Sequence, residues 1–127
     1  MKGIFAVLLC CMSSAAIADW MKVAGNATGT TYVDPTTLTK SGTTVKVWIL
    51  NDFKTFIKEE DGKPYLSMKR HQEYDCKARR LRSLTITVHS GNMGNGSLVH
   101  SGVDDMQWLP VTPGSIRETT WKHACGF

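Results

Sequence analysis

Residues 113–127 read Pro-Gly-Ser-Ile-Arg-Glu-Thr-Thr-Trp-Lys-His-Ala-Cys-Gly-Phe and carry start and stop signals for one short helix. Ser115 is a good N-cap, and Glu118, three residues later, completes a capping box. In that motif the Ser115 side chain accepts from the Glu118 N–H, while the Glu118 carboxylate reaches back to the Ser115 N–H. Gly126 follows as a natural C′ residue. A helix this short is unstable alone, so we expect it to dock on the rest of the chain.

The other end of the chain has the three parts of a signal peptide. Met1-Lys2-Gly3 is a short basic start, residues 4–12 form an apolar run, and Ala16-Ile17-Ala18 is a small-x-small cleavage site. We therefore predict that residues 1–18 are a signal peptide and that residues 19–127 form one exported domain. The alternative is a buried N-terminal helix. The apolar run is too short to span a membrane, and no later stretch is long enough.

The leader also contains Cys10 and Cys11, which raises the question of lipidation. A lipoprotein signal requires a small residue just before the lipidated cysteine. Leu9 precedes Cys10, and Cys10 precedes Cys11. We therefore expect the mature chain to start at Asp19 without a lipid.

Two cysteines, Cys76 and Cys125, remain after the leader is removed. Two cysteines in an exported protein usually pair, and a bond that closes so long a loop stabilises the fold by about 4 kcal/mol. Trp121 and Ala124 share a helix face with Cys125, so this bond would hold that face against the sheet near Leu66, Met68 and Tyr74. The alternatives are two free thiols or a pair of metal ligands.

The mature chain between these ends is dominated by strands. Residues 43–53 and 65–76 alternate apolar and polar side chains, and Cys76 ends the second run on its more apolar face. Asn95-Gly96 signals a hairpin turn, whereas Pro35 predicts a turn after residue 34. Trp48 and Trp108 are expected in the core. The predicted fold is α+β, a single antiparallel sheet of about six strands (residues 20–23, 30–34, 43–53, 65–76, 81–90 and 97–103) with a C-terminal helix.

No catalytic or metal motif is present in the sequence. His71, His89, His100 and His123 lack metal-ligand spacing, and there is no nucleophile elbow, P-loop or zinc-protease pattern. We therefore expect no enzyme, no metal and no cofactor. Loss of the leader removes only Lys2 from a net charge of +4, and so mild an excess does not imply a nucleic-acid partner.

One basic run, Lys77-Ala78-Arg79-Arg80-Leu81-Arg82, is the candidate binding site. Lys77, Arg79, Arg80 and Arg82 could bind an acidic protein surface, a glycosaminoglycan or a lipid headgroup. The competing interpretation is a solvated turn whose charges protect a sheet edge. Strand alternation would also place Arg79 opposite Arg80 and Arg82, which would divide the run.

Several segments together resemble the surface-adhesin protein E family of proteobacteria. They appear in the family's order, with the two cysteines in place: Tyr32-Val33-Asp34, Val45-Lys46-Val47-Trp48, Tyr65-Leu66-Ser67-Met68-Lys69, Tyr74-Asp75-Cys76, Met93-Gly94-Asn95-Gly96, Trp108-Leu109-Pro110-Val111, Pro113-Gly114-Ser115 and Ala124-Cys125.

The resemblance implies a curved six-stranded sheet, a helix tied to it by Cys76–Cys125, and a homodimer. It also implies binding of host extracellular-matrix or serum proteins such as vitronectin, laminin and plasminogen at the bacterial surface. A second function stays open: a periplasmic envelope protein that binds a small ligand or an envelope partner. Fold analogy transfers more readily than function, so the two must be separated by experiment.

Overall fold

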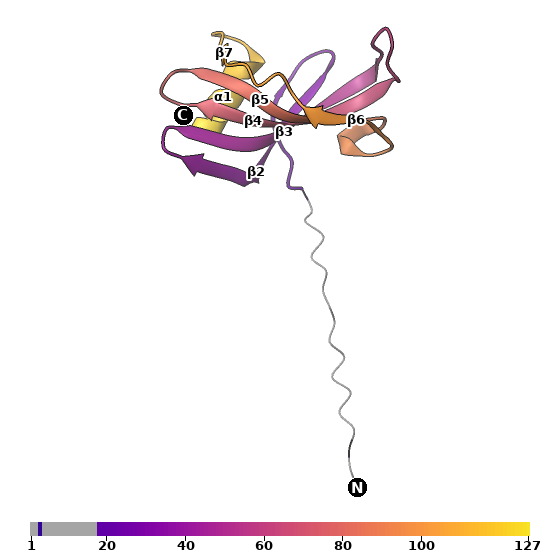
Figure 1. Ribbon diagram of the computed structural model, residues 1–127, viewed down its shortest axis with the longest axis horizontal. Helices are drawn as coiled ribbons and strands as arrows, with labels where there is room; N and C mark the ends of the chain where they lie inside the picture. Colours follow the sequence, from indigo (N-terminus) through magenta and orange to yellow (C-terminus); the bar gives the residue numbers. More distant parts are fainter. Residues whose placement is uncertain (1–2, 4–17) are drawn as a thin grey trace.

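The computed structural model describes Gly3 and residues 18–127, so the predicted signal peptide lies outside the described residues except for Gly3 and Ala18. One antiparallel sheet has the order β1-β2-β3-β4-β5-β6, and β7 pairs with the start of β5 (Figure 1). The predicted fold class is confirmed. The elements are β1 (Met21–Gly25), β2 (Gly29–Ser41), β3 (Thr44–Ile57), β4 (Tyr65–Asp75), β5 (Arg80–His89), the 3₁₀ turn η1 (Asn92–Gly94), β6 (Leu98–Val103), β7 (Leu109–Pro110) and α1 (Ile116–Cys125).

Helix α1 begins and ends where the sequence predicts. The Ser115 side chain accepts from the Glu118 N–H at 3.2 Å, and Gly126 is left-handed with φ 77°. The second half of the predicted capping box is wrong. The Ser115 N–H donates to the Thr112 carbonyl at 3.3 Å, so the Glu118 carboxylate accepts instead from the Gly114 N–H at 3.4 Å.

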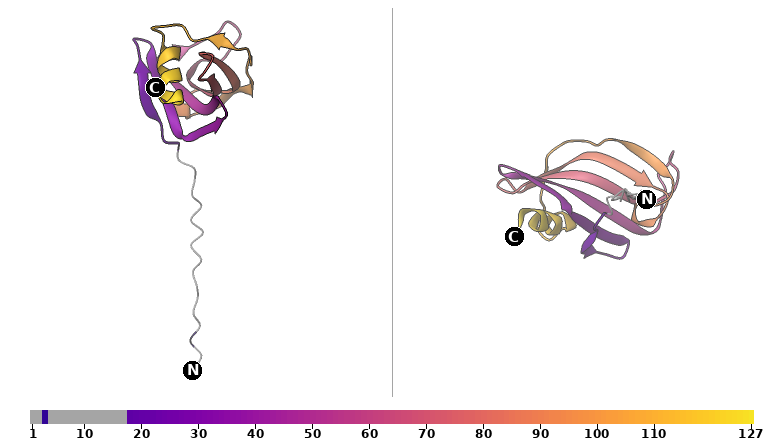
Figure 2. Two further views of the ribbon diagram at one scale, coloured as in Figure 1. Left: turned by 90° about the vertical axis from the view of Figure 1, so that its left-hand side faces the viewer. Right: turned by 90° about the horizontal axis from the view of Figure 1, so that it is seen from below.

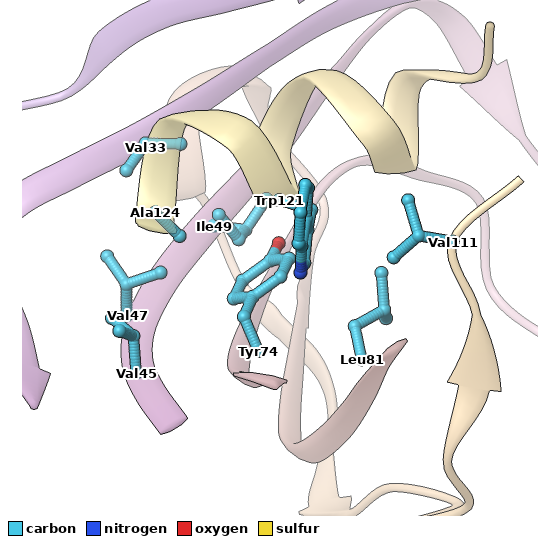
Figure 3. Close-up of a cluster of buried hydrophobic side chains, with 9 residues drawn as sticks. All are labelled: Val33, Val45, Val47, Ile49, Tyr74, Leu81, Val111, Trp121 and Ala124. Atoms are coloured by element: carbon cyan, nitrogen blue, oxygen red, sulfur yellow. The ribbon is translucent and has the colours of Figure 1, made fainter. Parts of the chain in front are cut away.

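The sheet is curved, and α1 lies against one of its faces, here called the helix face (Figure 2). Alternation along β3 puts Val45, Val47 and Ile49 on this face, beneath Trp121 and Ala124. Figure 3 shows Trp121 beside Tyr74 in this cluster. The complete core cluster is Val33, Val45, Val47, Ile49, Tyr74, Leu81, Val111, Trp121 and Ala124.

The predicted neighbours of Trp121 are correct only for Tyr74. Met68 belongs to a separate small cluster with Tyr65 and Val88, and Leu66 is half-buried outside both clusters. The physical reason is length, because a ten-residue helix spans only about 15 Å and covers part of one sheet face. The rest of the helix face lies beyond the reach of α1.

The Cys76–Cys125 disulfide is present, with an S–S distance of 2.08 Å and a Cα–Cα distance of 5.6 Å. It joins the end of β4 to the last residue of α1, as predicted. Within the same turn, the Trp121 indole N–H donates to the Asp75 carbonyl at 2.9 Å. The helix is therefore attached to the end of β4 by a covalent bond and a buried hydrogen bond.

The expected end of the second strand at Pro35 is wrong. Strand β2 continues to Ser41, because an irregularity in its pairing with β3 between Asp34 and Thr39 accommodates the proline.

The expected core positions of Trp48 and Trp108 are also wrong. Trp48 is half-buried on the face opposite the helix, called here the far face, where it stacks on His71 with ring centroids 5.0 Å apart. Trp108 is half-buried as well, because it covers arginine side chains rather than the core.

Candidate functional site

The basic run lies at the turn between β4 and β5, and Asp75 organises that turn. Its Oδ1 accepts from the Lys77 N–H at 3.1 Å and from the Ala78 N–H at 2.9 Å, while Arg80 Nε donates to Oδ2 at 3.1 Å. The Ala78 hydrogen bond and the Arg80 ion pair hold the pKa of Asp75 below its usual value, although burial opposes them. Asp75 is thus a charged acceptor that fixes the path of the run.

Arg79 turns toward the helix. Its backbone is left-handed, with φ 50°, and its guanidinium lies 4.5 Å from the centre of the Trp121 ring. Nη2 also pairs with Glu118 Oε2 at 2.9 Å. Arg79 therefore joins the β4–β5 turn to the first turn of α1, where a carboxylate also suits the helix dipole.

Arg80 and Arg82 share one indole. Both guanidinium groups lie over Trp108, at 4.4 Å and 4.5 Å from its ring centre. Arg80 pairs with Asp75 at 3.1 Å, and Arg82 pairs with Glu73 at 2.6 Å. Trp108 is thus held against the start of β5 by two cations, each with its own carboxylate.

The four predicted site residues do not form one patch. Arg79 belongs to the helix contact, whereas Arg80 and Arg82 belong to the Trp108 contact. All three arginines have a carboxylate partner within the chain. Lys77 is exposed, and among the described residues its side chain is in no ion pair. Lys77 is therefore the residue of the run whose charge remains free for a partner.

A groove of about 480 Å³ lies on the part of the helix face that α1 does not cover. Its apolar floor comes from β4, β5 and β6, and its rim includes the β3–β4 loop and an Arg70–Asp104 ion pair of 3.3 Å. The floor residues are Tyr65, Met68, Ile86, Val88 and Val99.

A second hollow, of about 430 Å³, lies on the far face between Trp20 and Trp48. Lys69 and His89 are its basic lining residues, and Asp34 is its acidic one. Burial and then the nearby Lys69 charge lower the pKa of His89, so this imidazole is neutral at pH 7. Indole walls with a few polar groups are typical of sites for small ligands.

The sequence did not reveal either hollow. Strand alternation places each lining residue on a face, but it does not show how far α1 extends over that face. Met68 carried a signal for the groove, because it is in phase with the core residue Tyr74 along β4. Val88 reaches the same face as the core residue Leu81 only because the register shifts at Leu84, which alternation does not predict. Within residues 18–127, no three metal-ligating side chains gather at one point, and no helix is long and apolar enough to cross a membrane.

Solved structures with the same fold come from Haemophilus influenzae. Protein E in its selenomethionine form gives a TM-score of 0.67 at 12% identity and covers 87% of this chain and 88% of that one. Crystal form II of protein E gives a TM-score of 0.64 at 13% identity and covers 87% of this chain and 89% of that one. Protein E from a non-typeable strain gives a TM-score of 0.59 at 12% identity and covers 89% of this chain and 79% of that one. At these identities the likeness shows the fold.

Sequence comparison supplies the family. No curated protein sequence matches the chain. A family model described as surface-adhesin protein E matches residues 20–126, which is nearly the whole of the predicted mature domain. It includes Cys76, Cys125, the basic run, the lining of the groove and, except for Ala18, the lining of the far-face hollow. The chain belongs to the surface-adhesin protein E family.

Proposed function

We propose that this chain is an exported bacterial protein whose mature domain, residues 19–127, is a non-enzymatic, adhesin-like binding module. The observation that carries this proposal is the family match over residues 20–126. The expected partners are host extracellular-matrix or serum proteins, and the domain is expected to act as a homodimer.

Two features of the molecule support export. The Cys76–Cys125 bond belongs to an oxidising compartment such as the periplasm or the cell exterior. The basic start, apolar run and small-x-small site come in the order that a signal peptide requires. We therefore propose cleavage between Ala18 and Asp19, followed by oxidation of the two remaining cysteines.

The basic run is the proposed contact for acidic partners, with Lys77 as the cation of the run that is in no ion pair among the described residues. We expect Lys77→Ser to weaken binding without loss of stability, because that side chain is in none of the ion pairs of the described residues. Arg82→Ser is the comparison variant. It would expose Trp108 and leave the mostly buried Glu73 without its partner, so a lower melting temperature should accompany any loss of binding.

The direct test is binding of the purified mature domain to immobilised laminin, vitronectin and plasminogen at several salt concentrations. We expect saturable binding to at least one of these proteins, and weaker binding as salt screens the charges. Failure to bind any of them, with a folded and oxidised domain, would contradict the host-protein part of the proposal. Sedimentation of the same sample measures the expected dimer.

The far-face hollow favours a second function, that of a periplasmic protein that binds a small ligand. Its two indoles and its size suit an aromatic or sugar-like molecule. Protease treatment of intact cells separates the two functions. A surface adhesin is digested while a periplasmic control protein survives, whereas a periplasmic binder is protected until the outer membrane is opened.

A further inference from the structure

The two edges of the sheet differ in how well they are protected. At one edge, β1 carries Lys22, has a bulge between Lys22 and Ala24, and packs beside the end of α1. At the other edge, β6 reads Leu-Val-His-Ser-Gly-Val and contains no proline, lysine or carboxylate. In native proteins, proline, charged side chains or a covering helix or loop normally prevent an edge strand from pairing with another chain. Within the described residues, β6 pairs only with β5, so its second edge is open.

The register identifies the open main-chain groups. The Asp104 N–H donates to the Leu84 carbonyl at 2.9 Å, and the same register pairs Thr85 with Val103. Hydrogen-bonded and non-bonded pairs alternate along an antiparallel ladder. Ser101 and Val103 therefore direct their N–H and C=O groups away from β5, toward the open edge.

This open edge borders the groove on the helix face. Val99 and His100 line the groove, and Gly102 follows on the same face as His100 because its partner, Ile86, lies on the groove floor. A side chain at position 102 would separate the edge from the groove. Gly102 leaves that passage clear, since a Cβ there would meet nothing nearer than the His100 ring at 3.8 Å.

We propose that β6 is a docking edge for an extended segment of a partner protein, which adds to the sheet as a further strand. The open groups of Ser101 and Val103 would bond its main chain, and alternate side chains would cross Gly102 into the groove. This inference deepens the proposed binding function and rests on it.

The chemistry of the groove describes the segment. Its floor is apolar, so the residues that enter it should be apolar at every second position. On the rim, the charges of Arg70 and Asp104 neutralise each other in an ion pair. The remaining charged rim residues are two carboxylates, Glu59 and Asp61, and one cation, Lys63. This small acidic excess favours a segment that also carries a basic residue.

A test that does not depend on any host protein uses a phage library of twelve-residue peptides, selected on the mature domain. Selected peptides should alternate apolar residues. Ser101→Pro should weaken their binding at least tenfold, because it removes an open N–H and leaves the β5 ladder intact. Ser101→Ala is the matched control and should bind within about twofold of the parent.

In the peptide experiment, three outcomes would overturn the proposal: no selected peptide, equal binding by Ser101→Pro, or selected peptides that bind elsewhere. Hydrogen exchange in the unmodified domain provides a check that does not require the proline variant to fold. Bound peptide should slow exchange at Ser101 and Val103, and unchanged exchange there contradicts strand addition. If Ser101→Pro instead turns a dimer into a monomer, the edge is filled by a second copy and not by a partner segment. If the domain binds host proteins but shows none of these effects, the proposed function is supported and strand addition at β6 is not part of it.

Discussion

At the scale of single residues, Trp121 makes several different contacts. The residue is 3% exposed, its indole N–H donates to the Asp75 carbonyl at 2.9 Å, and the Arg79 guanidinium lies 4.5 Å from the centre of its ring. Phe127 stacks on it at 5.1 Å from beyond the helix end. The residue therefore connects the core, the β4–β5 turn and the C-terminus.

Truncation of this indole should cost more than loss of its hydrogen bond. We expect Trp121→Ala to lower the free energy of unfolding by about 3–5 kcal/mol, because it leaves a large cavity. Trp121→Phe keeps most of the packing and should cost about 1–3 kcal/mol, mainly for the unpaired Asp75 carbonyl. Denaturant unfolding of the oxidised protein measures both. Equal losses in the two variants would show that packing is not the dominant contribution.

Asp75 makes stability depend on pH. The pKa of the Asp75 carboxyl is lowered in the folded state. Its contribution to the free energy of unfolding is therefore fully present above the unfolded pKa of about 3.9 and is lost as the pH falls through the folded pKa. The stability difference between the parent and Asp75→Asn should therefore be largest near pH 7 and shrink below about pH 4. Thermal unfolding from pH 2 to 7 measures this, with Asp61→Asn in the exposed loop as control. A difference independent of pH would contradict the assigned ion pair.

Leader removal should add a charge pair at the N-terminus. The Asp19 backbone nitrogen lies 3.3 Å from Oδ2 of Asp34, a carboxylate in a residue only 3% exposed. Cleavage before Asp19 would turn that amide into an ammonium. We expect the mature chain to melt a few degrees above a form that retains Ala18. This difference in melting temperature should shrink as the pH rises above about 8, the pKa of an unpaired α-amino group, because the amine then loses its proton. Asp34→Asn should abolish the difference, and a difference that survives it would refute the pairing.

At the scale of elements, α1 depends on its attachment. The helix has ten residues and would be marginal in isolation, so its buried face and the Cys76–Cys125 bond must hold it. The bond closes a loop of 49 positions, for which the chain-entropy model gives about 4 kcal/mol.

Loss of this bond should be the most destabilising single change at the element scale. We expect the double variant Cys76→Ser, Cys125→Ser to melt lower by about 15 °C or more. Reduction of the parent should produce the same fall, and reduction of the double variant should change nothing. A shift of only a few degrees would mean that packing alone holds α1 in place.

The elements themselves were largely predictable from local patterns. Ser115 and Gly126 set the helix ends, and period-two alternation located the strands. The predicted strand end at Pro35 was wrong because an irregularity in β2 accommodates the proline. That irregularity depends on pairing with the neighbouring strand and not on the local sequence. Trp48 and Trp108 misled because large side chains can cover the surface of a sheet as well as fill its core.

At the scale of the whole molecule, the candidate sites could be predicted only in part. The basic run was visible in the sequence, and alternation already separated Arg79 from Arg80 and Arg82. Its pairing with Glu73, Asp75 and Glu118 was not visible, because these contacts join residues from three elements. The groove depends on where α1 stops, and the open edge depends on strand order. Both are properties of the assembled sheet.

The central proposal for this chain is that it is an exported domain closed by one disulfide. Mass spectrometry of the protein isolated from its native cell envelope, with non-reducing peptide mapping, tests this most directly. We predict a chain that begins at Asp19, carries no lipid and no free thiol, and yields a peptide in which Cys76 is joined to Cys125. A chain that retains its leader, a lipid on Cys10 or Cys11, or two alkylatable thiols at Cys76 and Cys125 would contradict the account.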